Sequence, residues 1–268
     1  MSVLERIVAE KREEVAGLRA WAAALRREAE GAGAGRGLGA ALRRPEEVAL
    51  LAEVKRRSPS AGWILEGADA AGVARVYELS GAAAVSVLTD ESWFGGSLDD
   101  LRSVKAAVGI PVLRKDFIVD PVQVWQARAA GADGFLLIVR ILDDALLADL
   151  LALGRSLGMD ALVEVHGEGE LERALGAGAT VVGVNSRDLA TFETDLAVVE
   201  AMAAQVAEGV VLVGESGIGG PEDVERLGAA GVDAVLVGEA LMRAPDMSRA
   251  VERLTGRARR PRGSGASS

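Results

Sequence analysis

The chain has 268 residues and 50% hydrophobic composition, so it can bury a large core as one barrel or as two small domains. It contains no cysteine, which excludes disulfides, thiolate nucleophiles and cysteine-based zinc sites. The net charge of −10 argues against nucleic acid as a partner, because phosphate neutralisation needs clustered Lys and Arg. The same acidity repels anions at long range, so an anionic ligand must be held by locally placed cations.

Residues 1–48 are expected to form an N-terminal helical extension and linker. The charged, heptad-like pattern at 4–18 predicts an amphipathic helix that can cover one end of the main domain. The stretch 31–39 (GAGAGRGLG) has a loose GxG pattern, but no strand precedes it, so we interpret it as a flexible connection. No run approaches the roughly 20 apolar residues that span a bilayer, so we expect a cytoplasmic protein with no membrane partner.

From residue 49 to residue 256, short Val, Ile and Leu-rich runs alternate with helical segments, and the alternation repeats eight times. The strands are expected at 49–55, 83–89, 111–116, 134–140, 161–166, 181–185, 210–215 and 234–238. Eight regular units favour an α/β fold of the (β/α)8 TIM barrel type over a doubly wound sheet. The Arg-rich run that follows, with a Gly and Ser-rich end, is expected to be a disordered tail over 257–268.

Charged or amide side chains stand in the last residues of five predicted strands. They are Glu53, Lys55, Lys115, Glu164, Asn185 and Glu215. Taking an ionised group out of water costs several kcal/mol, so stability alone does not explain this placement. Residues two apart share a strand face, and the ends of parallel strands meet in one mouth. We therefore predict an active site there, with general acids, general bases and oriented hydrogen bonds.

Other readings of these residues stay open. Glu53 and Lys55 alone could be a buried ion pair without a chemical role, although contributions from five strands favour function. Opposite charges would keep the lysines protonated while burial would lower their pKa values, and the sequence does not decide between the two effects. His166 shares a face with Glu164, yet we favour a loop anchor over a base. No Asp, Glu or His spacing resembles a metal site, so no metal is expected.

Glycines that follow the seventh predicted strand and end the eighth indicate a phosphate site. The run 217–220 (GIGG) precedes a helix, and Gly238 ends the eighth strand. Barrels often bind phosphate after strands 7 and 8 through backbone N–H groups. Lys55, Lys115 and Arg187 are placed to hold an anion. Four aromatic residues either wall the mouth and stack on an aromatic ligand or serve as ordinary packing, namely Trp63, Trp93, Phe94 and Phe117.

The ordered motifs resemble those of the indole-3-glycerol phosphate synthase family, and the resemblance runs from residue 4 to about residue 254. The motifs are 53–60 (EVKRRSPS), 86–90 (SVLTD), 94–97 (FGGS), 113–117 (LRKDF), 162–166 (LVEVH), 185–189 (NSRDL) and 215–218 (ESGI). The resemblance implies ring closure of 1-(2-carboxyphenylamino)-1-deoxyribulose 5-phosphate to indole-3-glycerol phosphate with loss of CO2 and water. It also implies that no cofactor is needed, and that the N-terminal extension packs over the catalytic mouth.

By motif match, Lys115 resembles the acid that protonates the ketone, and Glu164 the carboxylate that assists proton transfer and stabilises the cationic intermediate. Glu53 and Lys55 match an ion pair that positions substrate and takes part in dehydration, and the division of labour between the two lysines stays open. The other site residues implied by the motifs are Asn185, Glu215 and Ser216 around the substrate, Ser58, Gly217 and Gly238 at the phosphate, and Arg187 at an anion. Phe94 and Phe117, from the aromatic residues considered above, complete the predicted binding site. The implied partner is a small substrate that carries a phosphate and a carboxylate. We expect the protein to be a monomer or a weak homo-oligomer.

Three positions depart from the family pattern: Ala61, Ser186 and Ala240 stand where lysine, asparagine and serine are common. They leave open a paralogue that acts on a modified anthranilate-derived substrate or has altered phosphate affinity. Two rivals remain. Phosphoribosylanthranilate isomerase commonly uses a cysteine base, which this chain lacks. A non-catalytic barrel that binds a phosphometabolite gains nothing from costly buried charges.

Overall fold

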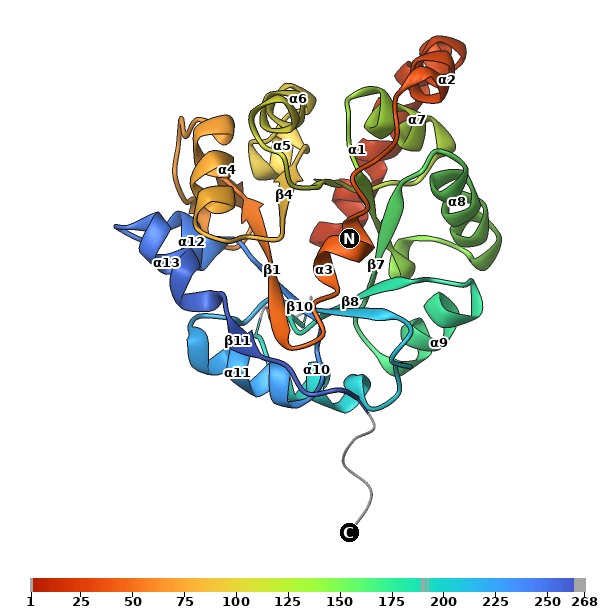
Figure 1. The fold of residues 1–268 in the computed structure, drawn as a ribbon. Coiled ribbons are helices and arrows are strands. Elements are labelled where there is room, and N and C mark those ends of the chain that lie inside the picture. Colours follow the sequence, from red (N-terminus) through yellow and green to blue (C-terminus); the bar gives the residue numbers. More distant parts are fainter. Residues whose placement is uncertain (1, 189–190, 192, 263–268) are drawn as a thin grey trace.

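The computed structural model describes residues 2–188, 191 and 193–262, and eight parallel strands in this part close into a barrel (Figure 1). Neighbouring strands pair in chain order, and β10 pairs with β1 to close the ring. The barrel strands are β1 (Glu47–Val54), β4 (Ala84–Leu88), β5 (Val112–Lys115), β6 (Gly134–Ile138), β7 (Asp160–Val165), β8 (Val181–Asn185), β9 (Val211–Glu215) and β10 (Ala234–Val237). The prediction of a (β/α)8 barrel is confirmed.

Helices surround the barrel and connect its strands (Figure 1). They are α4 (Ala70–Leu79), α5 (Glu91–Phe94), α6 (Leu98–Ala107), α7 (Pro121–Ala129), the 3-10 turn η2 (Val139–Ile141), α8 (Asp144–Ser156), α9 (Glu168–Gly176), α10 (Leu196–Ala203), α11 (Pro221–Ala229), α12 (Glu239–Met242) and α13 (Met247–Leu254). Aspartates cap many of them. At α7, for example, the Asp120 carboxylate accepts the backbone N–H of Val122, and Pro121 occupies the first turn. Among the described residues, no helix is both long enough and apolar enough to cross a membrane.

The core has two layers, which follow from the alternation of side chains along each strand. One cluster fills the barrel interior and includes Leu51, Leu113 and Leu162. The other lies between the barrel and its helices and includes residues offset by one position, such as Leu50 and Val163. Residues two positions beyond the interior leucines therefore point into the mouth, as the sequence pattern predicts.

A short helix plugs the N-terminal end of the barrel. Helix α3 (Leu38–Leu42) places Leu38 and Leu42, each 0% exposed, in the interior cluster. The segment before it is held firmly: the Arg36 backbone N–H donates to Asp133, and the Arg36 guanidinium donates to the carbonyls of Val108 and Ile110. The interpretation of 31–39 as a flexible connection was wrong. The open end of the barrel needs an apolar cover, and the hydrogen bonds of Arg36 hold the segment that leads into this cover.

The start of the expected disordered tail is also ordered. Strand β11 (Arg257–Ala258) pairs antiparallel with β1. Arg259 and Arg262 both contact the buried carboxylate of Asp233, at 2.9 Å and 2.7 Å. The expectation of disorder was wrong for 257–262, because the buried aspartate needs cationic partners, and this run supplies two of them. Residues 263–268 lie outside the described residues.

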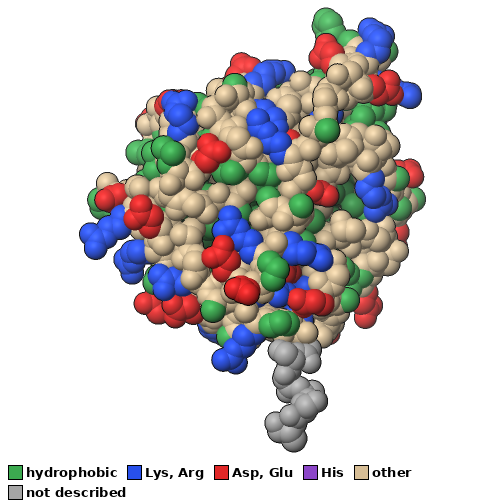
Figure 2. Space-filling model, viewed as in Figure 1, with side chains coloured by type: hydrophobic (Ala, Val, Ile, Leu, Met, Phe, Trp, Pro, Cys, Tyr) green, Lys and Arg blue, Asp and Glu red, His purple; other side chains and the backbone are tan. Residues whose placement is uncertain are grey.

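The N-terminal extension consists of α1 (Val3–Leu18), a 3-10 turn η1 (Arg19–Trp21) and α2 (Ala22–Gly31). A capping box starts α1: the Glu5 backbone N–H donates to the Ser2 hydroxyl, and the Ser2 N–H donates to the Glu5 carboxylate. Helix α2 packs on α7 and projects from the rim, as Figures 1 and 2 show. On the face drawn in Figure 2, basic and acidic side chains lie interspersed.

Candidate active site

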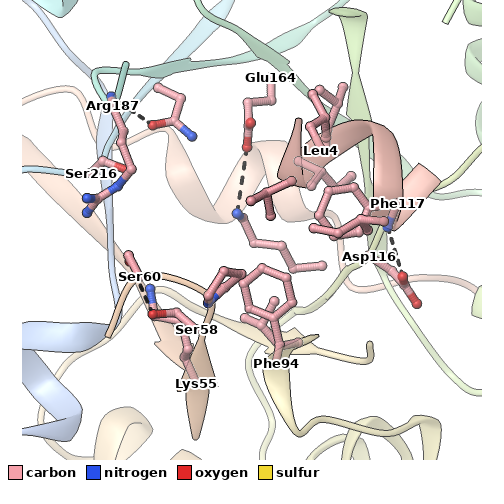
Figure 3. Close-up of a pocket in the computed structure, with 18 of the residues that line it drawn as sticks. Leu4, Lys55, Ser58, Ser60, Phe94, Asp116, Phe117, Glu164, Arg187 and Ser216 are labelled. Atoms are coloured by element: carbon pink, nitrogen blue, oxygen red, sulfur yellow. Dashed lines mark hydrogen bonds and ion pairs between the residues drawn. The ribbon is translucent and has the colours of Figure 1, made fainter. Parts of the chain in front are cut away.

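A cavity of about 410 Å³ lies at the carboxyl ends of the barrel strands, where the first turn of α1 contributes to its wall (Figure 3). Ten of the predicted site residues line it, namely Glu53, Lys55, Ser58, Phe94, Lys115, Phe117, Glu164, Asn185, Arg187 and Ser216. The parity of the strands therefore brings together side chains that are far apart in sequence. In the described part of the chain, no group of His, Asp and Glu side chains is arranged to hold a metal ion.

Lys115, at the end of β5, is the centre of this cluster. Its Nζ lies 3.6 Å from Glu164 Oε2, 3.7 Å from Glu215 Oε2 and 3.8 Å from Glu53 Oε2. Burial lowers the pKa of Lys115, but the three carboxylates outweigh it and hold the pKa above its usual value. The two opposing effects that the sequence left open are thus decided for this lysine, which is a charged proton donor at neutral pH.

The carboxylates around Lys115 differ in protonation. Burial, reinforced by the neighbouring charge of Glu164, raises the pKa of Glu215 to about 8. Burial also raises the pKa of Glu164, but the positive charges of Lys115 and His166 more than offset it, and the pKa lies below its ordinary value. At neutral pH Glu164 is therefore an ionised base and Glu215 holds a proton. Two adjacent carboxyl groups with pKa values pushed apart are suited to acid and base roles.

The end of β1 carries an ion pair. Lys55 Nζ lies 3.1 Å from Glu53 Oε1, and the Tyr77 hydroxyl donates to the Glu53 carbonyl at 3.2 Å. A Cβ at position 238 would lie 2.6 Å from Glu53 Oε1, so Gly238 leaves room for this carboxylate. Gly238 does not line the cavity, and neither does Gly217. A phosphate contact at these two glycines stays a prediction.

The cavity has an apolar side and a polar side. In Figure 3, Phe94, Phe117 and Leu4 gather on one side, and Arg187 and Ser216 lie on the other. The rings of Phe94 and Phe117 have centroids 6.0 Å apart. Such a division suits a ligand with an aromatic ring at one end and an anionic group at the other. Of the four aromatic residues considered from sequence, Trp63 and Trp93 do not line the cavity.

Local backbone structure positions two serines on the polar side of the cavity, Ser58 and Ser216. Ser58 belongs to a short hairpin of β2 (Arg57–Ser58) and β3 (Gly62–Trp63), and its hydroxyl accepts the N–H of Ala61 at 3.1 Å. Ser216 has a φ of 66°, a conformation that non-glycine residues rarely adopt. The Ser186 hydroxyl donates to the Ser216 carbonyl at 3.1 Å. Ser186, one of the three departures, thus holds the strained turn.

Sequence reasoning missed several lining residues, including Leu4, Ile7, Arg140 and Glu239. Arg140 carried a usable signal, because it follows the fourth strand at the level where other strands end in charged groups. For α1, the amphipathic pattern of 4–18 and the family resemblance predicted a helix over the mouth, but neither identified which of its residues line the cavity, since that depends on the tertiary fold. His166 also lines the cavity, and its backbone N–H donates to Glu170 at 2.8 Å.

Fold and site together define a (β/α)8 barrel with a lysine and carboxylate cluster in its catalytic mouth. The family model of indole-3-glycerol phosphate synthase matches residues 4–254. The indole-3-glycerol phosphate synthase of Beutenbergia cavernae is 50% identical over 244 residues, covering 90% of each chain. That of Roseiflexus sp. strain RS-1 is 49% identical over 265 residues, covering 95% of this chain and 98% of the relative. The chain belongs to the indole-3-glycerol phosphate synthase family.

The fold extends beyond that family. A solved structure titled thiamine phosphate pyrophosphorylase from Pyrococcus furiosus superposes with a TM-score of 0.59 at 18% identity, covering 77% of this chain and 93% of the other. At that identity the likeness shows the barrel alone. Function must therefore be argued from the site and from the family.

Proposed function

We propose that this chain is an indole-3-glycerol phosphate synthase, which closes 1-(2-carboxyphenylamino)-1-deoxyribulose 5-phosphate to indole-3-glycerol phosphate in tryptophan biosynthesis. The observation that carries the proposal is the partly buried Lys115 ammonium, within 3.8 Å of Glu53, Glu164 and Glu215 at the barrel mouth. A purely binding protein has no use for three buried carboxyl groups around one ammonium, since burying each of them costs desolvation energy.

The geometry supports a division of roles. Lys115 donates its proton to the ketone oxygen as the aryl carbon attacks, because it is the charged donor at the centre of the cavity. Glu164, ionised at neutral pH, faces the positive charge that builds on the anilino nitrogen. The Glu53 and Lys55 pair holds the resulting hydroxyl during dehydration. Asn185, Glu215 and Ser216 complete the polar surroundings of the substrate.

The two sides of the cavity orient the substrate. The aryl ring fits between Leu4, Phe94 and Phe117, and the phosphate lies toward Ser58 and Arg187 with Gly217 and Gly238 behind them. Ring closure, decarboxylation and dehydration need only proton transfers and no external electron acceptor, so we propose that no cofactor takes part. We also propose a monomer or weak homo-oligomer in the cytoplasm, which light scattering and fractionation test.

The experiment is a fluorescence assay of the purified chain with the carboxyphenylamino substrate, following indole formation. Lys115→Met is expected to lower kcat by roughly 10² to 10⁴-fold, since a positioned proton donor contributes about that much. Arg102→Met, which removes an exposed cation from α6, is the matched control and should keep full activity.

Three results would contradict the proposal in different ways. A kcat in Lys115→Met equal to that of the unmodified chain would remove the lysine from the mechanism. Tight binding of substrate without turnover by the unmodified chain would indicate a binding barrel. Turnover confined to ring-substituted substrates would indicate a paralogue of another pathway.

A further inference from the structure

His166 lies between two carboxylates at the wall of the cavity. Its Nε2 is 3.4 Å from Glu164 Oε1, and its Nδ1 is 3.4 Å from Glu170 Oε2. The side chain is 5% exposed, and neither ring nitrogen makes a hydrogen bond of ordinary geometry among the described residues. The other oxygen of Glu170 accepts Nε of Arg140 at 2.8 Å, and the other oxygen of Glu164 faces Lys115 at 3.6 Å. A continuous series of charged groups thus runs from Arg140 to Lys115.

Electrostatics fixes where the ring carries its hydrogens. Burial raises the pKa of Glu170, but the nearby His166 ring and hydrogen bonds from the His166 backbone N–H and from Arg140 bring it down to about 2, so Glu170 is a permanent anion at neutral pH. A lone pair on Nδ1 would face this anion, so Nδ1 carries a hydrogen. Nε2 and Glu164 Oε1 then share one proton, because two lone pairs at this distance would repel.

The proposed reaction consumes a proton. Lys115 gives one proton to the ketone oxygen, and the hydroxyl so formed needs a second proton to leave as water. Only one proton returns to the protein, from the methylene carbon next to nitrogen, because the substrate carboxylate leaves as CO2 without releasing any. Each turnover therefore takes one proton from solvent into a site whose central groups are buried.

We propose, on the basis of the proposed function, that His166 is the positioning residue through which this proton reaches Glu164. The Nε2 proton passes to Glu164, and Glu164 gives it to the hydroxyl as the C–O bond breaks and its electron pair goes to the water oxygen. The ring then regains a proton from solvent, and Glu170 holds Nδ1 so that Nε2 stays aimed at Glu164. The charged groups facing the ring are Glu164 on β7 and Glu170 on α9, with Arg140 behind Glu170 and with Lys115 and Glu215 behind Glu164.

The test is the single-turnover rate of indole formation as a function of pH, in H2O and D2O. His166→Asn is expected to lower the rate by roughly 10²-fold, the lower end for a positioned proton-transfer group, to enlarge the solvent isotope effect, and to regain rate with added imidazole. Glu170→Gln should keep the fold and change the pH profile of the rate, because a neutral amide no longer fixes the hydrogen on Nδ1 that keeps Nε2 aimed at Glu164. Glu172→Gln, on the exposed side of the same helix, is the matched control and should behave as the unmodified chain.

Two results would overturn the inference while leaving the synthase function intact. One is an unchanged rate and isotope effect in His166→Asn. The other is a loss of rate in His166→Asn with an unchanged solvent isotope effect and no rescue by imidazole, together with an unchanged pH profile in Glu170→Gln. That combination would mean that the His166 ring only packs. Absence of indole formation by the unmodified chain would instead refute the synthase function, and the proton route with it.

Discussion

Replacing Lys11 by methionine should loosen the helix that covers the active site. Lys11 is buried on α1, and its Nζ contacts Glu14 at 2.8 Å, Asp90 at 2.9 Å and Asp116 at 3.1 Å. Asp90 and Asp116 belong to the barrel, and Asp116 directly follows Lys115. The methionine keeps the apolar stem of the side chain, so the substitution removes mainly the charge.

The size of the effect follows from the partners that remain. Losing one member of a buried ion pair costs about 3 to 5 kcal/mol, because the other member stays buried and unpaired. Here Asp116 keeps Arg114 at 2.9 Å, and Asp90 keeps the backbone N–H of Trp93 at 2.8 Å. We therefore expect the lower end, about 3 kcal/mol, which is roughly a 10²-fold change in the docking equilibrium of α1.

Hydrogen exchange followed by mass spectrometry measures this opening directly. Amides of α1 should exchange roughly 10²-fold faster in Lys11→Met, while amides of the barrel strands should be unchanged. The KM should rise as well, because the first turn of α1 lines the cavity. Arg12→Met, which removes an exposed charge from the same helix, is the control. Equal exchange of α1 in both variants would refute the reasoning, since it would mean that apolar packing alone docks the helix.

Two further predictions concern stability. The folded pKa of Glu215, about 8, lies above its ordinary value, so the stability it contributes is present at acid pH and is lost as the pH rises through about 8. The melting temperature of Glu215→Gln relative to that of the unmodified chain should therefore increase as the pH is raised from about 5 to about 9. A difference in melting temperature that stays constant with pH would contradict the shifted pKa of Glu215. Leu42→Ala, in the barrel plug, should cost about 2 to 5 kcal/mol in urea unfolding. Leu79→Ala, at a position 86% exposed, should cost little, and equal losses would show that α3 is not a true plug.

The positions of the acidic and basic site residues could be predicted from the sequence, because side chains along a strand alternate between its two faces. Once Leu51 and Leu113 are assigned to the interior, Glu53 and Lys115 must point into the mouth on the same faces. Charged residues in apolar runs carry a desolvation cost, which makes them visible against a hydrophobic background. The barrel follows from the eightfold alternation by the same local reasoning.

The ends of the chain were misread for a related reason. Glycines in 31–39 and arginines in 257–262 have the composition of mobile segments, and composition is local. What orders them lies elsewhere in the chain: the open end of the barrel, which Leu38 fills, and the buried carboxylate of Asp233, which two arginines neutralise.

The sequence by itself determined the barrel and the strand ends that carry the acids and bases, because periodicity and desolvation act residue by residue. Only the tertiary structure decided that Lys115 faces three glutamate side chains, that Glu215 holds a proton where Glu164 does not, and that His166 lies between two glutamates. These properties depend on distances of a few ångströms between side chains from different elements. Coulomb energies and desolvation change steeply over such distances, and no spacing along a single strand records them.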